Sequence, residues 1–185
     1  MTLPPRGHDS RDHILFLCTG NAARSVMATV MFRDRSDAYR VTGAGTHVIE
    51  GHPMSVRTRR ALERHGLVDR THRSRQMWQE DATSAALVVA MAPEHVRWVR
   101  QNQPAAAPRT ATIKRLVQML PSAQGATLAE RVGALRLETI EPEDWEEVVD
   151  PASGEQPVFD DCVDELDVLV GALLAALNLA NGYQS

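Results

Sequence analysis

Apolar residues along this chain follow two patterns, short continuous runs and longer stretches with helical spacing. The run Ala86–Met91 is almost entirely apolar, which is typical of a strand buried on both faces of a parallel sheet. The stretch from 159 to 180 instead repeats leucine and valine at helical spacing, which predicts a long amphipathic helix. The expected strands cover about 13–17, 39–44, 86–91 and 110–113. The expected helices cover about 24–35, 55–65, 93–101, 114–120, 128–137 and 159–180.

This alternation of strands and helices predicts an α/β fold, a single three-layer domain with a four-stranded parallel sheet flanked by helices. No linker divides the chain, so we expect residues 13–185 to form this domain. Residues 1–12 are polar and contain proline and glycine, which predicts a flexible N-terminal tail. Ligands of parallel sheets bind beyond the carboxyl ends of the strands. The first expected strand ends next to Cys18, which directs attention to that residue.

Composition and charge narrow the classes of function. The chain has 185 residues and a net charge of -4, so its overall charge gives no sign of nucleic-acid binding. It contains neither an apolar secretory segment near its start nor an apolar run of about 18 residues that would cross a membrane. Two cysteines do not form a disulfide framework, and we expect a reducing, cytoplasmic location. The seven histidines lack metal-ligand spacing, so no metal and no cofactor is expected.

The stretch Cys18–Ser25 carries the candidate chemistry, because it links the first expected strand to the first expected helix. Backbone amides of such a loop bind an anion together with the positive end of the helix dipole. Arg24 adds a planar fork of donors that fits an oxyanion, and the same field favours the thiolate of Cys18. Ser25 can donate a hydrogen bond to that sulfur. We call this expected anion-binding loop, Cys18–Ser25, the cradle. Its remaining members are Thr19, Gly20, Asn21, Ala22 and Ala23.

This loop and its flanking elements resemble the low-molecular-weight protein tyrosine phosphatase family, which carries Cys-x-Gly-Asn-x-Cys-Arg-Ser at the same strand-to-helix junction. The chain departs from that pattern at Ala23, where most members have a second cysteine, and at Val26, where many have proline. The resemblance implies a flavodoxin-like fold and hydrolysis of phosphomonoesters through a phosphocysteine intermediate. The implied substrate is a phosphorylated protein, with phosphotyrosine foremost, or a small aryl phosphate. Inorganic phosphate or a similar oxyanion would bind in the loop.

A phosphatase of this kind needs a general acid, because the leaving oxygen must gain a proton as its bond to phosphorus breaks. Asp-Pro is also an ordinary turn pair, but the family carries Asp-Pro in a mobile loop before its last helix. Here Asp150-Pro151 precedes the last expected helix, so the resemblance implies Asp150 as the acid. Other carboxylates remain as alternatives, namely Glu138, Glu141, Glu143 and Asp144.

The resemblance also implies support and wall residues around the cradle. Asn21 would take a left-handed conformation, which asparagine tolerates, within a hydrogen-bond network that includes His72. Ile49, Ala152 and Ser153 occupy positions of the substrate wall where relatives often have aromatic residues. The absence of aromatic side chains there weakens the case for aryl substrates.

The stretch 114–147 is longer than in minimal members of the family, and we expect a family-variable helical insertion there. It could form a lid over the site or an exposed addition without a catalytic role. Its acidic part, 138–147, is interpreted as a solvated face. Trp145 within it is interpreted as a cover for the core.

Two other functions remain open. Arsenate has the charge and geometry of phosphate, so the cradle also fits an arsenate reductase. Such an enzyme would need an external thiol, because Cys162 is expected in the packed last helix. A protein that binds phosphorylated ligands without turnover is the second alternative.

Overall fold

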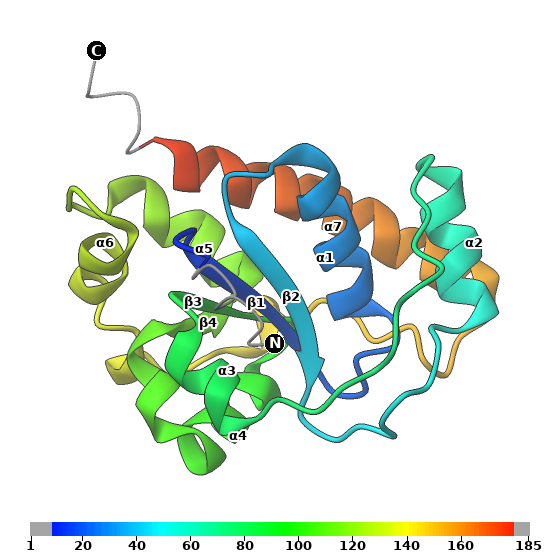
Figure 1. The fold of residues 1–185 in the computed structure, drawn as a ribbon, viewed down its shortest axis with the longest axis horizontal. Coiled ribbons are helices and arrows are strands. Elements are labelled where there is room, and N and C mark those ends of the chain that lie inside the picture. Colours follow the sequence, from blue (N-terminus) through cyan, green and yellow to red (C-terminus); the bar gives the residue numbers. More distant parts are fainter. Residues whose placement is uncertain (1–8, 180–185) are drawn as a thin grey trace, which may run out of the picture.

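A four-stranded parallel sheet forms the centre of the computed structural model, which describes residues 9–179 (Figure 1). The strand order is β2-β1-β3-β4, and every neighbouring pair is parallel. The strands are β1 (His13–Cys18), β2 (Arg40–Gly45), β3 (Leu87–Ala90) and β4 (Thr110–Thr112). The α-helices are α1 (Arg24–Arg35), α2 (Val56–Arg64), α3 (Gln79–Ser84), α4 (Pro93–Asn102), α5 (Ile113–Met119), α6 (Leu128–Ala134) and α7 (Gln156–Asn178). This architecture confirms the predicted three-layer α/β fold.

Helices cover both faces of the sheet because β1 is apolar on both of its sides. Ile14 and Phe16 pack in one cluster with α1, α5 and α7, whereas Leu15 and Leu17 pack in a second cluster on the side of α4. All four side chains are fully buried. In Figure 1, α1, α5 and α7 lie on one side of the sheet and α3 and α4 on the other. The carboxyl end of β1 therefore lies at the edge of a sheet that is closely packed on both faces.

Several element boundaries differ from the sequence-based expectation. The helix expected over 128–137 ends at Ala134, and Arg136 adopts a left-handed conformation with φ of 50°. The proline-rich stretch 104–108, which contains helix-breaking residues, forms part of a 3-10 helix, η1 (Pro104–Arg109). The last helix begins at Gln156, because Pro157 fits the first turn of a helix, where its missing N–H costs nothing.

The stretch 114–147 is neither a lid nor an exposed addition. Its apolar side chains lie in the same cluster as those of α1 and α7, and Leu116, Leu120 and Leu137 are at most 2% exposed. It contains three 3-10 helices besides α5 and α6, which are η2 (Leu120–Ser122), η3 (Leu137–Thr139) and η4 (Asp144–Glu146). The stretch is therefore part of the main core.

The interpretation of the acidic stretch 138–147 as a solvated face holds for five of its six carboxylates, which are exposed, and the exception is Glu146. Glu146 is buried, with 1% of its surface exposed, so the stretch is not a uniformly solvated face. Trp145 does not cover the core, because it is 42% exposed and the Arg115 guanidinium lies 4.9 Å from its ring centroid. Charge density in the sequence could not reveal that these side chains have arginine partners on other helices.

The tail predicted for residues 1–12 lies mostly outside the described residues. Its described part, 9–12, is exposed, and Asp9 pairs with Arg11 at 2.7 Å. Among residues 9–179, no helix is both long and apolar enough to cross a membrane.

Arg131 ties α6 to the end of α7, and we expect its replacement to destabilise the fold. Its guanidinium is 2% exposed and donates to the carbonyls of Leu177, Leu120 and Ala176 at 3.1, 2.9 and 2.8 Å. Arg131→Met would remove all three hydrogen bonds, and although the Leu120 carbonyl keeps the one from the Ala123 amide, the loss should cost roughly 3 kcal/mol of unfolding free energy. Urea denaturation would measure it, with exposed Arg60→Met as the matched control.

Candidate active site

The loop between β1 and α1 brings Cys18, Arg24 and Ser25 together at the edge of the sheet. Cys18 ends β1 and is 3% exposed, and its Sγ lies 3.0 Å from Ser25 Oγ. Arg24 begins α1, and its side chain is 2% exposed. A loop that closes on the first turn of a helix directs amides and the positive helix end at one point. The arrangement suits a bound oxyanion beside the sulfur.

Asn21 is the structural centre of this loop. Its φ of 49° lies in the left-handed region, which asparagine tolerates better than most residues. Its carbonyl accepts hydrogen bonds from His72 Nε2 at 2.9 Å and Ser74 Oγ at 2.8 Å. Its side chain accepts from the Arg75 amide at 3.1 Å and donates to Ser25 Oγ at 3.0 Å. Hydrogen bonds thus connect the segment around His72 to Ser25, which contacts Cys18 Sγ.

The end of β2 approaches the loop closely because residue 45 is glycine. A Cβ atom there would lie 2.4 Å from the Thr19 carbonyl oxygen, closer than atoms can come. The Thr46 and His47 amides, which follow Gly45, donate to the carbonyls of Cys18 and Thr19, both at 2.9 Å. The outward-facing carbonyls of the loop are therefore satisfied by the neighbouring strand, and its conformation is fixed.

Asp150 lies against Arg24 although the two are far apart in the sequence. Arg24 Nη2 donates to Asp150 Oδ2 at 2.6 Å, and Nη1 donates to the Val148 carbonyl at 3.1 Å. The second carboxylate oxygen of Asp150 accepts from the Ala152 amide at 3.0 Å. The Asp150 side chain is 42% exposed, so it can meet both Arg24 and a ligand that enters from solvent.

The other proposed site residues lie at the surface or in other contacts. Ile49 is 72% exposed, and Ala152 and Ser153 are also exposed. We call these three expected wall positions the rim. Of the alternative acids, Glu141 pairs with Arg97 and Arg100, and Glu143 pairs with Arg115. Among the described residues, no contact links any of the four alternatives to Arg24.

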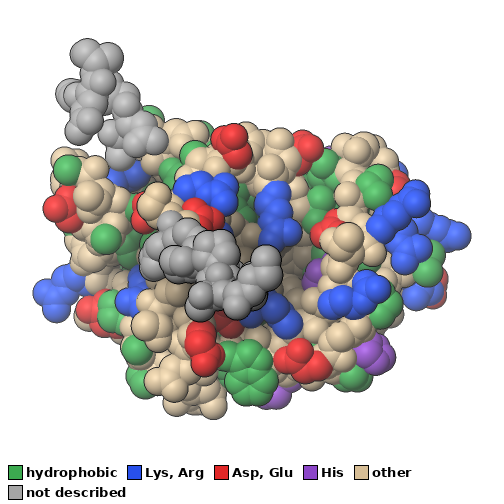
Figure 2. Space-filling view, viewed as in Figure 1, with side chains coloured by type: hydrophobic (Ala, Val, Ile, Leu, Met, Phe, Trp, Pro, Cys, Tyr) green, Lys and Arg blue, Asp and Glu red, His purple; other side chains and the backbone are tan. Residues whose placement is uncertain are grey.

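A polar cavity of about 220 Å³ adjoins Asn21, and Cys18 is not among the residues that line it. Its lining includes Asn21, Thr29, Arg33, Thr42, His72 and Arg75. On the face drawn in Figure 2, Lys and Arg side chains surround a hollow in this region. The support network of the loop therefore borders solvent-accessible polar space.

Sequence reasoning missed His95 in the first turn of α4. His95 is 1% exposed, and its Nε2 lies 3.0 Å from Thr19 Oγ1 in the loop. Burial, with the nearby charges of Arg24 and His47, lowers the pKa of His95 to about 3. The one signal in the sequence is Pro93, which begins a helix after β3 and places the next residues at the carboxyl edge of the sheet.

We expect stability to fall as the pH drops below 6.5, because His95 and His13 are buried as neutral rings. Burial, with Arg40 nearby, lowers the pKa of His13 to about 4. Unfolding restores values near 6.5, so the unfolded chain binds more protons and each histidine should cost up to about 1.4 kcal/mol per pH unit below that value. Urea denaturation at pH 7 and pH 5 should show a smaller loss for His95→Asn than for wild type. The exposed control His52→Asn should behave as wild type.

One protein family matches more than half of this chain. The family model described as low molecular weight phosphotyrosine protein phosphatase matches residues 13–130. The chain belongs to this family. It is therefore an enzyme of the cysteine-dependent phosphatase type, as the loop sequence predicts.

Curated relatives of this phosphatase include enzymes named for two different substrates. The protein-arginine-phosphatase of Geobacillus stearothermophilus is 34% identical over 105 residues, which are 56% of this chain and 70% of that protein. The low molecular weight protein-tyrosine phosphatase A of Mycobacterium tuberculosis is 41% identical over 98 residues, 48% of this chain and 58% of that protein. The names of these relatives therefore do not identify which phosphorylated side chain this enzyme acts on.

Solved structures of the family share the fold over nearly the whole chain. The YwlE arginine phosphatase from Geobacillus stearothermophilus superposes with a TM-score of 0.76 at 27% identity, covering 94% of this chain and 97% of that one. The low molecular weight protein tyrosine phosphatase from T. tengcongensis gives 0.71 at 28% identity, covering 89% and 98%.

Proposed function

We propose that the phosphatase hydrolyses phosphorylated side chains of proteins through a phosphocysteine intermediate, with Cys18 as nucleophile. The observation that carries the proposal is the contact of one buried guanidinium, Arg24, with Asp150 beside the Cys18 loop. An anion-binding arginine, a nucleophile and a candidate acid thus meet in one place. The four alternative acids show no such contact with Arg24.

In the first step, the Cys18 thiolate attacks phosphorus while the bond from phosphorus to the leaving oxygen breaks. Asp150 gives its proton to that oxygen, so the product leaves as a neutral hydroxyl compound. Arg24 and the loop amides of residues 19–25 hold the equatorial oxygens, whose charge they stabilise. Ser25 donates a hydrogen bond to the sulfur, which stabilises the thiolate as it becomes the leaving group of the second step.

In the second step, the Asp150 carboxylate takes a proton from water, and the resulting hydroxide attacks phosphorus. The bond from sulfur to phosphorus breaks, which releases inorganic phosphate and restores the thiolate. Asp150 is again protonated at the end of the cycle. Asn21 and His72 act by holding the loop in the conformation that this chemistry needs.

Phosphotyrosine is the first candidate substrate, because relatives of the family carry that name. Phosphoarginine is the second candidate, and one observation favours it. The rim positions Ile49, Ala152 and Ser153 carry no aromatic ring to stack on a phenyl group. The relative that is 34% identical over 105 residues is named a protein-arginine-phosphatase. With phosphoarginine the leaving atom is nitrogen, and Asp150 would protonate it in the same way.

Matched peptides that differ only in the phosphorylated residue would test these substrates. Wild-type enzyme should release inorganic phosphate from a phosphotyrosine or a phosphoarginine peptide, and the ratio of kcat/KM values identifies the side chain. Arsenite formation from arsenate and a small thiol, without phosphate release from any peptide, would show a reductase instead. Saturable binding of the peptides without phosphate release would show a non-catalytic binder.

A further inference from the structure

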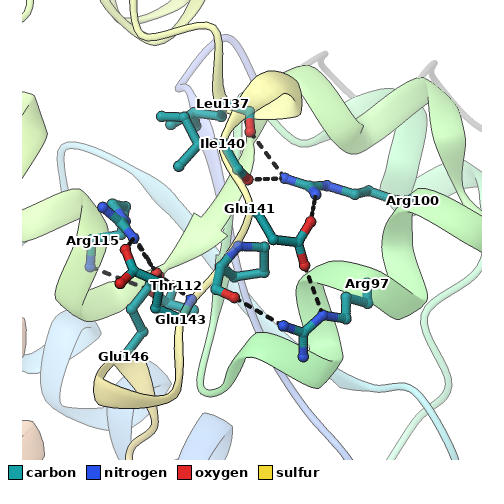
Figure 3. A network of polar contacts seen from close by, with 10 residues as sticks. Arg97, Arg100, Thr112, Arg115, Leu137, Ile140, Glu141, Glu143 and Glu146 are labelled. Carbon is teal, nitrogen blue, oxygen red and sulfur yellow. Dashed lines mark hydrogen bonds and ion pairs between the residues drawn. The ribbon is translucent and has the colours of Figure 1, made fainter.

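The acidic segment Glu141–Glu147 is held by arginines of α4 and α5 (Figure 3). Its buried member, Glu146, accepts from Arg115 Nε at 3.1 Å, Arg115 Nη2 at 2.5 Å and the Thr112 hydroxyl. Oε1 of Glu146 also accepts from the Glu143 amide at 2.8 Å. The carboxylate oxygens of Glu146 therefore have few lone pairs left for other donors. Burial opposes ionisation of Glu146, but these hydrogen bonds outweigh it and lower its pKa.

A second anchor lies five residues earlier, at Glu141. Arg97 Nε and Arg100 Nη1 donate to the two carboxylate oxygens of Glu141 at 3.0 and 3.1 Å. The same two arginines donate to the carbonyls of Pro142 and Leu137 at 2.9 and 3.2 Å. Figure 3 shows both anchors on one strip of chain, with the arginines reaching it from the helices. Glu141 is 69% exposed, so solvent weakens this anchor relative to Glu146.

The anchored strip leads directly to Asp150. Lys114 Nζ donates to the Glu147 carbonyl at 2.6 Å, and the Val148 amide donates to the Met91 carbonyl at 2.8 Å. The next contacts are those of Arg24 with the Val148 carbonyl and the Asp150 carboxylate. Each of the residues 146, 147 and 148 thus makes at least one contact with a residue outside the strip, and Asp150 follows two residues later.

We propose that Glu146 and Arg115 are positioning residues for Asp150, acting through the chain between 146 and 150. The proposal rests on the proposed function of Asp150 as the general acid. Both carboxylate oxygens of Glu146 accept hydrogen bonds, so glutamine at this position would lose the charge and would turn an NH2 group toward one set of donors. The guanidinium is then held less tightly, and the strip gains freedom to move. A displacement of about 1 Å in a reacting group can reduce a rate by about 10²-fold. Because the strip is still held at Val148, we expect a smaller displacement of Asp150 and a smaller loss of rate.

The kinetic test compares kcat/KM for phenyl phosphate and p-nitrophenyl phosphate. Glu146→Gln should lower the value for phenyl phosphate about 10-fold and that for p-nitrophenyl phosphate much less, because only the poorer leaving group depends strongly on a well-placed acid. Inhibition by inorganic phosphate should stay unchanged. In an Asp150→Asn background, Glu146→Gln should add no further loss, since the group that it positions is gone. Glu138→Gln is the matched control, because Glu138 is an exposed carboxylate just before this segment.

Hydrogen exchange of the segment 145–155 gives a readout that does not depend on the role of Asp150. Glu146→Gln and Arg115→Lys should both speed exchange at the Val148 and Ala152 amides, whereas Glu138→Gln should not. Arg115→Lys also serves if Glu146→Gln does not fold. Unchanged exchange, equal losses for both substrates, or additive losses with Asp150→Asn would overturn the proposal. If Asp150→Asn itself shows no dependence on the leaving group, the proposed acid is wrong, and exchange still decides whether Glu146 holds the segment.

Discussion

Replacing Cys18 with serine is expected to lower turnover of p-nitrophenyl phosphate by roughly 10⁴-fold or more, as loss of a covalent nucleophile does in other enzymes. Serine keeps the size of the side chain and its contact with Ser25. A hydroxyl, however, is far harder to ionise than a thiol, and the field of the loop and Arg24 cannot make up the difference. Release of p-nitrophenol in the steady state would measure the loss, and circular dichroism would check the fold.

Cys162 provides the matched control for this experiment. It lies in α7, is 4% exposed, and burial raises the pKa of its thiol to about 12. Cys162→Ala should therefore keep its activity, and iodoacetamide at neutral pH should label Cys18 but not Cys162 in the wild type. Bound phosphate should protect Cys18 from the reagent. Wild-type activity in Cys18→Ser, or labelling of Cys162 in preference to Cys18, would contradict the mechanism.

The cradle was predictable because its parts are adjacent in the sequence. An apolar strand, the loop from Cys18 to Ser25 and a helix follow one another, and their chain order dictates their meeting at the carboxyl edge of the sheet. The sheet itself was predictable for a similar reason, since β1 and β3 are apolar on both faces. The sequence pattern was sufficient to predict a feature wherever that feature is formed by residues adjacent in the sequence.

Contacts between distant segments were not predictable from local pattern. Asp150 and Arg24 are 126 positions apart, and only the family resemblance pointed to Asp150. Glu146 illustrates the limit, because its neighbours Glu143, Asp144 and Glu147 give it the sequence context of a surface residue. Its burial depends on Arg115 and Thr112, which come from another part of the chain. A single buried histidine such as His95 likewise carries no pattern of its own.

Replacing Asp150 with asparagine is expected to slow the first chemical step according to the leaving group. The amide oxygen can still accept from Arg24, so the loop should keep its place, but the proton for the leaving oxygen is lost. General acid catalysis contributes about 10²–10⁴-fold, and phenyl phosphate should lose kcat/KM in that range. p-Nitrophenyl phosphate should lose much less, because p-nitrophenolate leaves without needing the proton. The ratio kcat/KM is the right measure, since it excludes the later hydrolysis of the phosphocysteine.

The other carboxylates before Asp150 give this experiment its controls. Glu141→Gln and Glu143→Gln remove ion pairs with Arg97, Arg100 and Arg115, and Asp144→Asn removes an exposed charge. None should show a dependence on the leaving group as steep as that of Asp150→Asn, because none contacts the guanidinium that would hold the phosphoryl group. If both substrates instead lose rate equally in Asp150→Asn, and one of these variants shows the steep dependence, the acid is that carboxylate. Asp150 would then serve only to orient Arg24, which the 2.6 Å ion pair would suffice to do.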